Sequence, residues 1–198
     1  MRLKLAALLL ASLAVTPALA SGLTGMGAAI YGNTFNFKKA NLTEAPVNKI
    51  TVGKLDVGLE TTRLAEIQKA FGGTLQQDGE ATWLCYHAED TNTWFISNAF
   101  GGQEFVMMVA VEASSDTPGD CEAANEKFAP PVFNVPGIGA KTADIKAHFG
   151  AASSGSKISF RADRPGGYSD IAQYLGYVLK GGTVTGIGVG ETSIETVH

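Results

Sequence analysis

Apolar residues along the chain follow first a helical period and then a strand period. Leu64, Ile67 and Phe71 recur at the spacing of one helix face. The glycines at positions 72 and 73 end this helix, because glycine readily takes the left-handed conformation of a helix stop. Three segments rich in β-branched and aromatic residues follow, with turn residues between them. We expect antiparallel strands at Ala81–His87, Thr93–Ser97 and Glu104–Val111.

The same order of elements returns 78 positions later. The segment LAEIQKAFGG at 64–73 aligns with TADIKAHFGA at 142–151, and four of the ten positions are identical. A second set of strands is expected at Lys157–Ala162, Ile171–Leu179 and Thr183–Val189. Self-similarity at one fixed spacing indicates a repeated structural unit. The sequence therefore predicts an α+β fold of two tandem helix-plus-antiparallel-meander (αβββ) units, with the helices on one face of the sheet.

The segments outside the two units are weakly patterned or rich in proline. Ile30, Phe35 and Phe37 could form an edge strand or lie across the sheet. A short helix is expected around Glu122–Phe128, within a stiff proline-containing linker. The predicted division is a signal peptide at 1–20, an extension at 21–54, a first unit with a disulfide at 55–113, a linker at 114–132 and a second unit at 133–198.

The first twenty residues have the features of a secretory signal. Arg2 and Lys4 precede an apolar stretch, and Ala18-Leu19-Ala20 forms a small-residue cleavage site. The apolar stretch is too short for a transmembrane helix. We expect cleavage after Ala20, a periplasmic or secreted location, and no membrane insertion of the cleaved chain.

Net charge argues against nucleic-acid partners. The chain has 15 Lys and Arg against 19 Asp and Glu. Without Arg2 and Lys4, thirteen basic residues remain and the net charge is −6. Nucleic-acid binding needs clustered basic residues that neutralise phosphates, and binding to an anionic membrane needs a polybasic run. The sequence offers neither, so another protein or an envelope component is the expected partner.

Cys85 and Cys121 are the only cysteines. Two cysteines in an exported protein favour a structural disulfide. This bridge would remove about 3.8 kcal/mol of unfolded-chain entropy on the chain-entropy description. A redox-active dithiol is the alternative, but such pairs usually lie close together as Cys-x-x-Cys.

The strands of the first unit are apolar on both faces. A sheet with one solvated face should alternate between apolar and polar residues. Either residues 21–50 or the other unit cover the second face, or it is an aromatic and methionine-rich docking surface. On the docking hypothesis, the contact residues are Tyr86, Trp94 and Met108 in the first unit and Tyr174 and Tyr177 in the second. Core packing is the alternative role for each.

No catalytic or metal-binding motif is present in the sequence. His87, His148 and His198 lack the spacing of zinc ligands, and there is no Gly-x-Ser-x-Gly elbow. We therefore expect a non-enzyme without metal or cofactor. The alternative is a periplasmic hydrolase whose carboxylates converge only in the fold.

The two helices ending in Phe71-Gly72 and Phe149-Gly150, each followed by a meander, resemble the beta-lactamase inhibitor protein fold. A single unit is similar to the SmpA/OmlA family of envelope-assembly lipoproteins. The first resemblance implies a non-enzymatic protein whose sheet binds another protein, and the second implies an envelope scaffold. Residue 21 is Ser, so the lipid-bearing cysteine of such lipoproteins is missing at that position. The function expected is an exported protein-binding module that acts through its sheet face.

Overall fold

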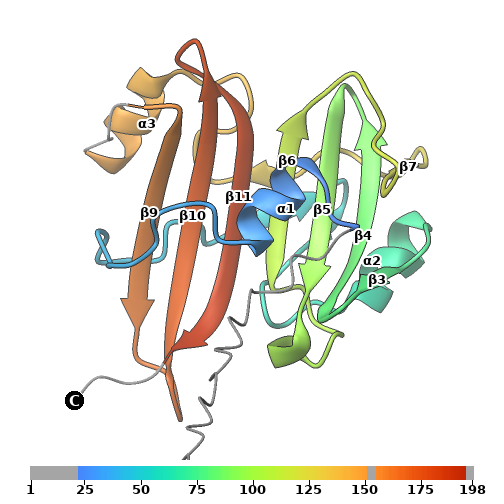
Figure 1. The fold of residues 1–198 in the computed structure, drawn as a ribbon, viewed down its shortest axis with the longest axis horizontal. Coiled ribbons are helices and arrows are strands. Elements are labelled where there is room, and N and C mark those ends of the chain that lie inside the picture. The colour runs from blue at the N-terminus through green and yellow to red at the C-terminus, as the bar shows by residue number, and fades with distance from the viewer. Residues whose placement is uncertain (1–21, 151–154, 195–198) are drawn as a thin grey trace, which may run out of the picture.

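The computed structural model describes residues 22–150 and 155–194, which form one long antiparallel sheet packed between helices (Figure 1). This confirms the α+β class. The helices are α1 (Gly25–Tyr31), α2 (Leu64–Phe71) and α3 (Thr142–Phe149), with a 3-10 turn at Ala99–Gly101. The strands are β1 (Ile50–Val52), β2 (Leu55–Asp56), β3 (Gln76–Asp78), β4 (Ala81–Ala88), β5 (Thr91–Ser97), β6 (Met108–Ala113), β7 (Glu122–Ala123), β8 (Val132–Phe133), β9 (Lys157–Arg164), β10 (Asp170–Lys180) and β11 (Thr183–Ile194).

The strands of both units belong to a single sheet, in the order β3-β4-β5-β6-β11-β10-β9. The last strands of the two units, β6 and β11, pair antiparallel at its centre. Ala110 pairs there with Gly188, its own equivalent at the 78-residue spacing. The register of this central pair is therefore symmetric about Ala110 and Gly188. A short second sheet, β2-β1-β8, lies apart from the main one.

Local geometry around α2 and α3 repeats at the same spacing. The first backbone N–H of each helix donates to a carbonyl oxygen just before the last strand of its unit. Leu64 donates to Glu104 O (2.7 Å), ahead of β6, and Thr142 donates to Gly182 O (3.0 Å), ahead of β11. The first turns are also closed alike. The Glu66 carboxylate accepts from the Arg63 N–H at 3.2 Å, and the Asp144 carboxylate from the Lys141 N–H at 2.7 Å. A carboxylate at the third helical position satisfies an amide that the helix itself leaves unpaired.

The helices of the two predicted units lie on one face of the sheet, as expected, and a third helix from the extension lies on the other face. The apolar sides of α2 and α3 lie in one core, through Leu64, Ile67 and Ile145. The helix α1 packs on the opposite face, across β5, β6 and β11 (Figure 1). The extension therefore lies over the sheet, because both faces of the central strands are apolar and each needs cover.

After α1, the extension follows the outer edge of β9. The backbone amides of Asn41 and Leu42 donate to Arg161 O at 2.9 and 3.0 Å, and the Asn41 side chain donates to Ser159 O at 3.1 Å. These bonds occupy backbone groups of an edge strand that could otherwise pair with another chain. The extension then enters the opposite core, where Val47 and Ile50 are buried.

The linker contains no helix in the range 122–128. Glu122 and Ala123 instead pair in parallel with Tyr86 and His87 of β4, because the bridge from Cys121 to Cys85 holds this segment beside that strand. The second cysteine therefore lies in the linker, outside the 55–113 range given for the first unit. No helix among the described residues is long and apolar enough to cross a membrane.

Candidate functional site

The five residues proposed as sheet-face contacts are all buried. Trp94 and Tyr177 have no exposed surface, Tyr86 and Met108 have 1% and 5%, and Tyr174 has 9%. The hypothesis that they form an open docking surface does not fit this structure, because the extension covers one face and α2 and α3 cover the other. Each belongs to a core instead.

Tyr86 and Tyr177 lie in the core shared with α2 and α3. The Tyr86 hydroxyl donates to the Gly72 carbonyl at 2.7 Å and so closes the end of α2. Burial raises the pKa of both phenols. On the other face, Tyr174 lies under the Phe37 ring, with centroids 4.8 Å apart.

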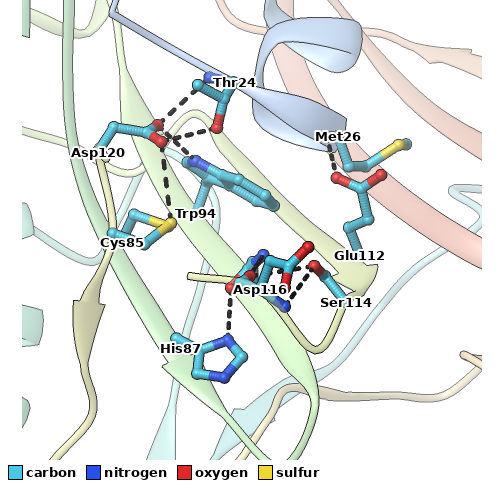
Figure 2. Close-up of a disulfide and its surroundings, with 11 residues drawn as sticks. Thr24, Met26, Cys85, His87, Trp94, Glu112, Ser114, Asp116 and Asp120 are labelled. Atoms are coloured by element: carbon cyan, nitrogen blue, oxygen red, sulfur yellow. Dashed lines mark hydrogen bonds between the residues drawn. A yellow bond between two sulfur atoms is a disulfide. The ribbon is translucent and has the colours of Figure 1, made fainter. Parts of the chain in front are cut away.

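The expected disulfide is confirmed, since Cys85 and Cys121 are bridged with their Cα atoms 4.4 Å apart. The neighbouring Asp120 carboxylate accepts from the Trp94 indole N–H at 2.9 Å and from the Thr24 hydroxyl at 2.6 Å (Figure 2). Asp120 and the two sulfurs lie close enough together to suggest a metal site. The sulfurs are bonded to each other, however, so they are not thiolate ligands.

A polar cluster occupies a small cavity between the extension and the second unit. The Glu191 carboxylate, 6% exposed, accepts from the Arg164 guanidinium at 3.2 Å and from the Gln173 amide at 2.8 Å. The Gln173 carbonyl oxygen in turn accepts from the Val47 N–H at 2.7 Å. The cavity has a volume of about 330 Å³. These hydrogen bonds run from Val47 through Gln173 to Glu191, so the cluster holds the extension against β10 and β11.

Glu60 approaches the same cluster from the first unit. Burial raises the pKa of its carboxyl, the charge of Glu191 raises it further, and Arg164 opposes the shift. Glu60 also has a left-handed backbone, with φ of 58°. The charges of Glu60 and Glu191 therefore influence each other in the fold. The two residues lie 131 positions apart in the chain, and no motif in the sequence links them.

An apolar groove of about 890 Å³ lies beside α2. We define the lysine-rimmed groove by its lining residues, which are Gly53, Lys54, Leu55, Lys69, Ala70, Phe71, Glu126, Lys127, Phe128 and Ala129. They come from the β1–β2 turn, the last turn of α2 and the linker. Half of them, including all three lysines, are exposed, so the hollow is open to solvent.

The floor of the lysine-rimmed groove is held in place by aromatic contacts. Phe71 and Phe128 meet edge to face with centroids 5.3 Å apart, and Phe128 also contacts Tyr86 at 5.0 Å. The Asn125 side chain donates to Phe71 O at 2.5 Å and fixes the linker against the helix end. Sequence reasoning missed this site, because its lysines come from three separate segments and form no run.

Comparison with protein families, with curated proteins and with solved structures finds no match to this chain. The resemblance to the inhibitor fold and to the envelope lipoproteins therefore stays a prediction.

Proposed function

We propose that this chain is an exported, non-enzymatic binding protein of the cell envelope and that the lysine-rimmed groove is its contact surface. The partner is a segment of another protein with acidic and apolar side chains. The observation that carries the proposal is the composition of the groove, which combines an apolar floor with three exposed lysines and one glutamate.

The net charge of the groove is opposite in sign to that of the whole chain. The whole chain has a formal net charge of −4, whereas the groove lining has a net charge of +2. A cationic patch on an anionic protein selects acidic partners locally, because exposed charges act over about 10 Å at moderate ionic strength. The apolar floor supplies the area from which water is removed on binding.

An open groove suits a peptide better than a small molecule. Small-molecule sites usually enclose most of the ligand surface, whereas half of this lining faces solvent. The exposed side chains of Lys54, Lys69 and Lys127 surround an aromatic and aliphatic floor. This arrangement matches peptide recognition. Apolar side chains of the peptide fill pockets, and charged groups at the rim select peptides of the opposite charge.

The test is the binding of two labelled ten-residue peptides, measured by fluorescence anisotropy. One alternates Glu and Leu, and the other alternates Lys and Leu. The acidic peptide should bind more tightly, although the net charge of the protein favours the basic one. Reversal of Lys54, Lys69 and Lys127 to Glu should weaken acidic-peptide binding at least about tenfold.

A matched control reverses Lys39, Lys146 and Lys180, which are equally exposed and lie outside the groove. This control makes the same change in net charge and should leave the affinity within about twofold. A protein that binds the basic peptide better, or that responds equally to both triple changes, contradicts the proposal.

A hydrolase is the second candidate, and the effect of the Glu191 charge on the pKa of Glu60 favours it. One carboxyl with a raised pKa beside a carboxylate held by Arg164 fits the separation of acid and base roles in hydrolysis. The check is turnover of chromogenic glycosides and peptide anilides by the wild type and by Glu60→Gln. Turnover that disappears with Glu60→Gln supports the hydrolase, and turnover unaffected by the change contradicts it.

A further inference from the structure

The helix α1 has little stability of its own. It has seven residues, two of which are Gly25 and Gly27. Helices of this length are marginal in water, and each glycine costs about 1 kcal/mol relative to alanine. Thr24, at the N-cap position, makes no capping bond, since its hydroxyl donates to Asp120. The helix therefore depends on the sheet beneath it.

Two carboxylates from the sheet side hold the start of α1. The Glu112 side chain accepts from the Met26 N–H at 3.0 Å (Figure 2). Asp120 accepts from the Thr24 hydroxyl at 2.6 Å and from the Thr24 N–H at 3.3 Å. Carboxylates at this end satisfy unpaired amides and complement the helix dipole.

Asp120 is held in place by its neighbours. Cys121, the next residue, is bridged to Cys85 on β4. The Asp120 carboxylate also accepts from the indole N–H of Trp94 on β5. One side chain thus joins α1 to β5, and the disulfide fixes the position of that side chain.

The surface beneath α1 is apolar and rich in methionine. A Cβ atom at Gly27 would lie 2.7 Å from the Trp94 ring, so the helix backbone rests directly on the indole. Met107 and Met108 are buried in the same cluster, together with Met26 of α1. Surfaces of this composition adapt to varied apolar partners.

We propose that α1 is a displaceable cover over this face of the sheet. The hydrogen bonds of Asp120 hold the cover in place, and the Cys85–Cys121 disulfide fixes the position of Asp120. Without the bridge, only the short pairing of β7 joins the segment that carries Asp120 to β4, and α1 leaves the sheet while β9, β10 and β11 stay folded. This goes beyond the proposed function, because the cover lies on the opposite face from the lysine-rimmed groove.

Closure of the cover follows oxidation of the two cysteines. The thiols of Cys85 and Cys121 exchange with an external disulfide, lose two electrons and two protons, and form their own bridge. The external disulfide takes these up and becomes two thiols. The cover would then close in an oxidising compartment and stay open in a reducing one.

The test is amide hydrogen exchange followed by mass spectrometry on the full chain and on two variants. The first is Cys85→Ser with Cys121→Ser. The second, Asp120→Ala, keeps the bridge and removes only the carboxylate that holds the start of α1. In both variants, exchange of the peptide over residues 25–31 should become about tenfold to a hundredfold faster, as expected for the loss of charge-assisted hydrogen bonds. Peptides from β10 and β11 should change less than about twofold.

Glu44→Ala removes an exposed carboxylate of the extension outside α1 and serves as the control, with no expected change at residues 25–31. Unchanged exchange at residues 25–31 in Asp120→Ala overturns the proposal. Faster exchange across the whole chain in both variants also overturns it. The disulfide would then stabilise the whole fold, and α1 would be an ordinary part of the core.

Discussion

The helices α2 and α3 begin and end at equivalent positions, yet their surroundings differ. Phe71 at the end of α2 is 5% exposed, enclosed by Tyr86 and by Phe128 of the linker. Phe149 at the end of α3 is half-buried and stacks on Phe160, with centroids 4.1 Å apart. The linker thus encloses the end of α2, and no segment among the described residues encloses the end of α3 in the same way. This difference shows that the helix and strands common to both units support the fold. The linker, which packs beside α2, completes the lysine-rimmed groove.

The largest expected effect comes from truncating the two phenylalanines. Phe71→Ala should lower the free energy of unfolding by about 3–5 kcal/mol, because it empties an enclosed aromatic cluster. Phe149→Ala should cost about half as much, because this ring keeps an exposed side. Urea denaturation of both variants measures the difference. Equal losses would mean that the linker does not close the core over α2.

The second prediction concerns position 60, where the first unit has Glu60 and the equivalent residue of the second unit is Ile138. The pKa of Glu60 is raised above its ordinary value of 4.5, so its ionised form destabilises the folded chain. This destabilisation is missing below pH 4.5 and grows as pH rises through the folded-state pKa.

Glu60→Gln should therefore stabilise the protein more at pH 7 than at pH 4. Thermal unfolding at the two pH values gives the measurement, and Glu80→Gln on the exposed surface is the control. A gain that is equal at both pH values, or larger at pH 4, would contradict the assigned environment of Glu60.

The smallest effect is expected at the helix starts, where the two units agree. Glu66→Ala and Asp144→Ala each remove one carboxylate that caps a backbone amide. Each should cost about 0.5–1 kcal/mol of stability, and the two losses should match. Chemical denaturation tests this, and a threefold difference would show that the two first turns are not equivalent.

Periodic and local features of the fold could be predicted from the sequence. Helix starts and stops follow from apolar spacing and from Gly72 and Gly150, and most strands follow from their apolar runs. The strand expected at Glu104–Val111 is an exception, because it begins only at Met108, after a turn. The chain direction at residues 122–128 was not predictable, because the bridge at Cys121 outweighs local helix preference there. The position of α1 was also hidden, since its seven residues with two glycines carry no strong helical signal.

The candidate site was less predictable than the fold. Trp94 and Met108 are the residue types that docking surfaces favour, but composition alone does not reveal that α1 lies above them. Conversely, Lys54, Lys69 and Lys127 look like ordinary surface lysines until the tertiary fold brings the turn, the helix and the linker together. Sites assembled from distant segments depend on long-range packing, which local patterns do not encode.

The most direct test of the groove compares one charge reversal on each helix. Lys69 and Lys146 both lie exposed in the last turn of their helices, and only Lys69 borders the groove. The dissociation constant of the alternating Glu–Leu peptide should rise about threefold to tenfold with Lys69→Glu. It should stay unchanged with Lys146→Glu. Equal weakening by the two changes would show that only general charge attracts the peptide, and it would contradict a binding site beside α2.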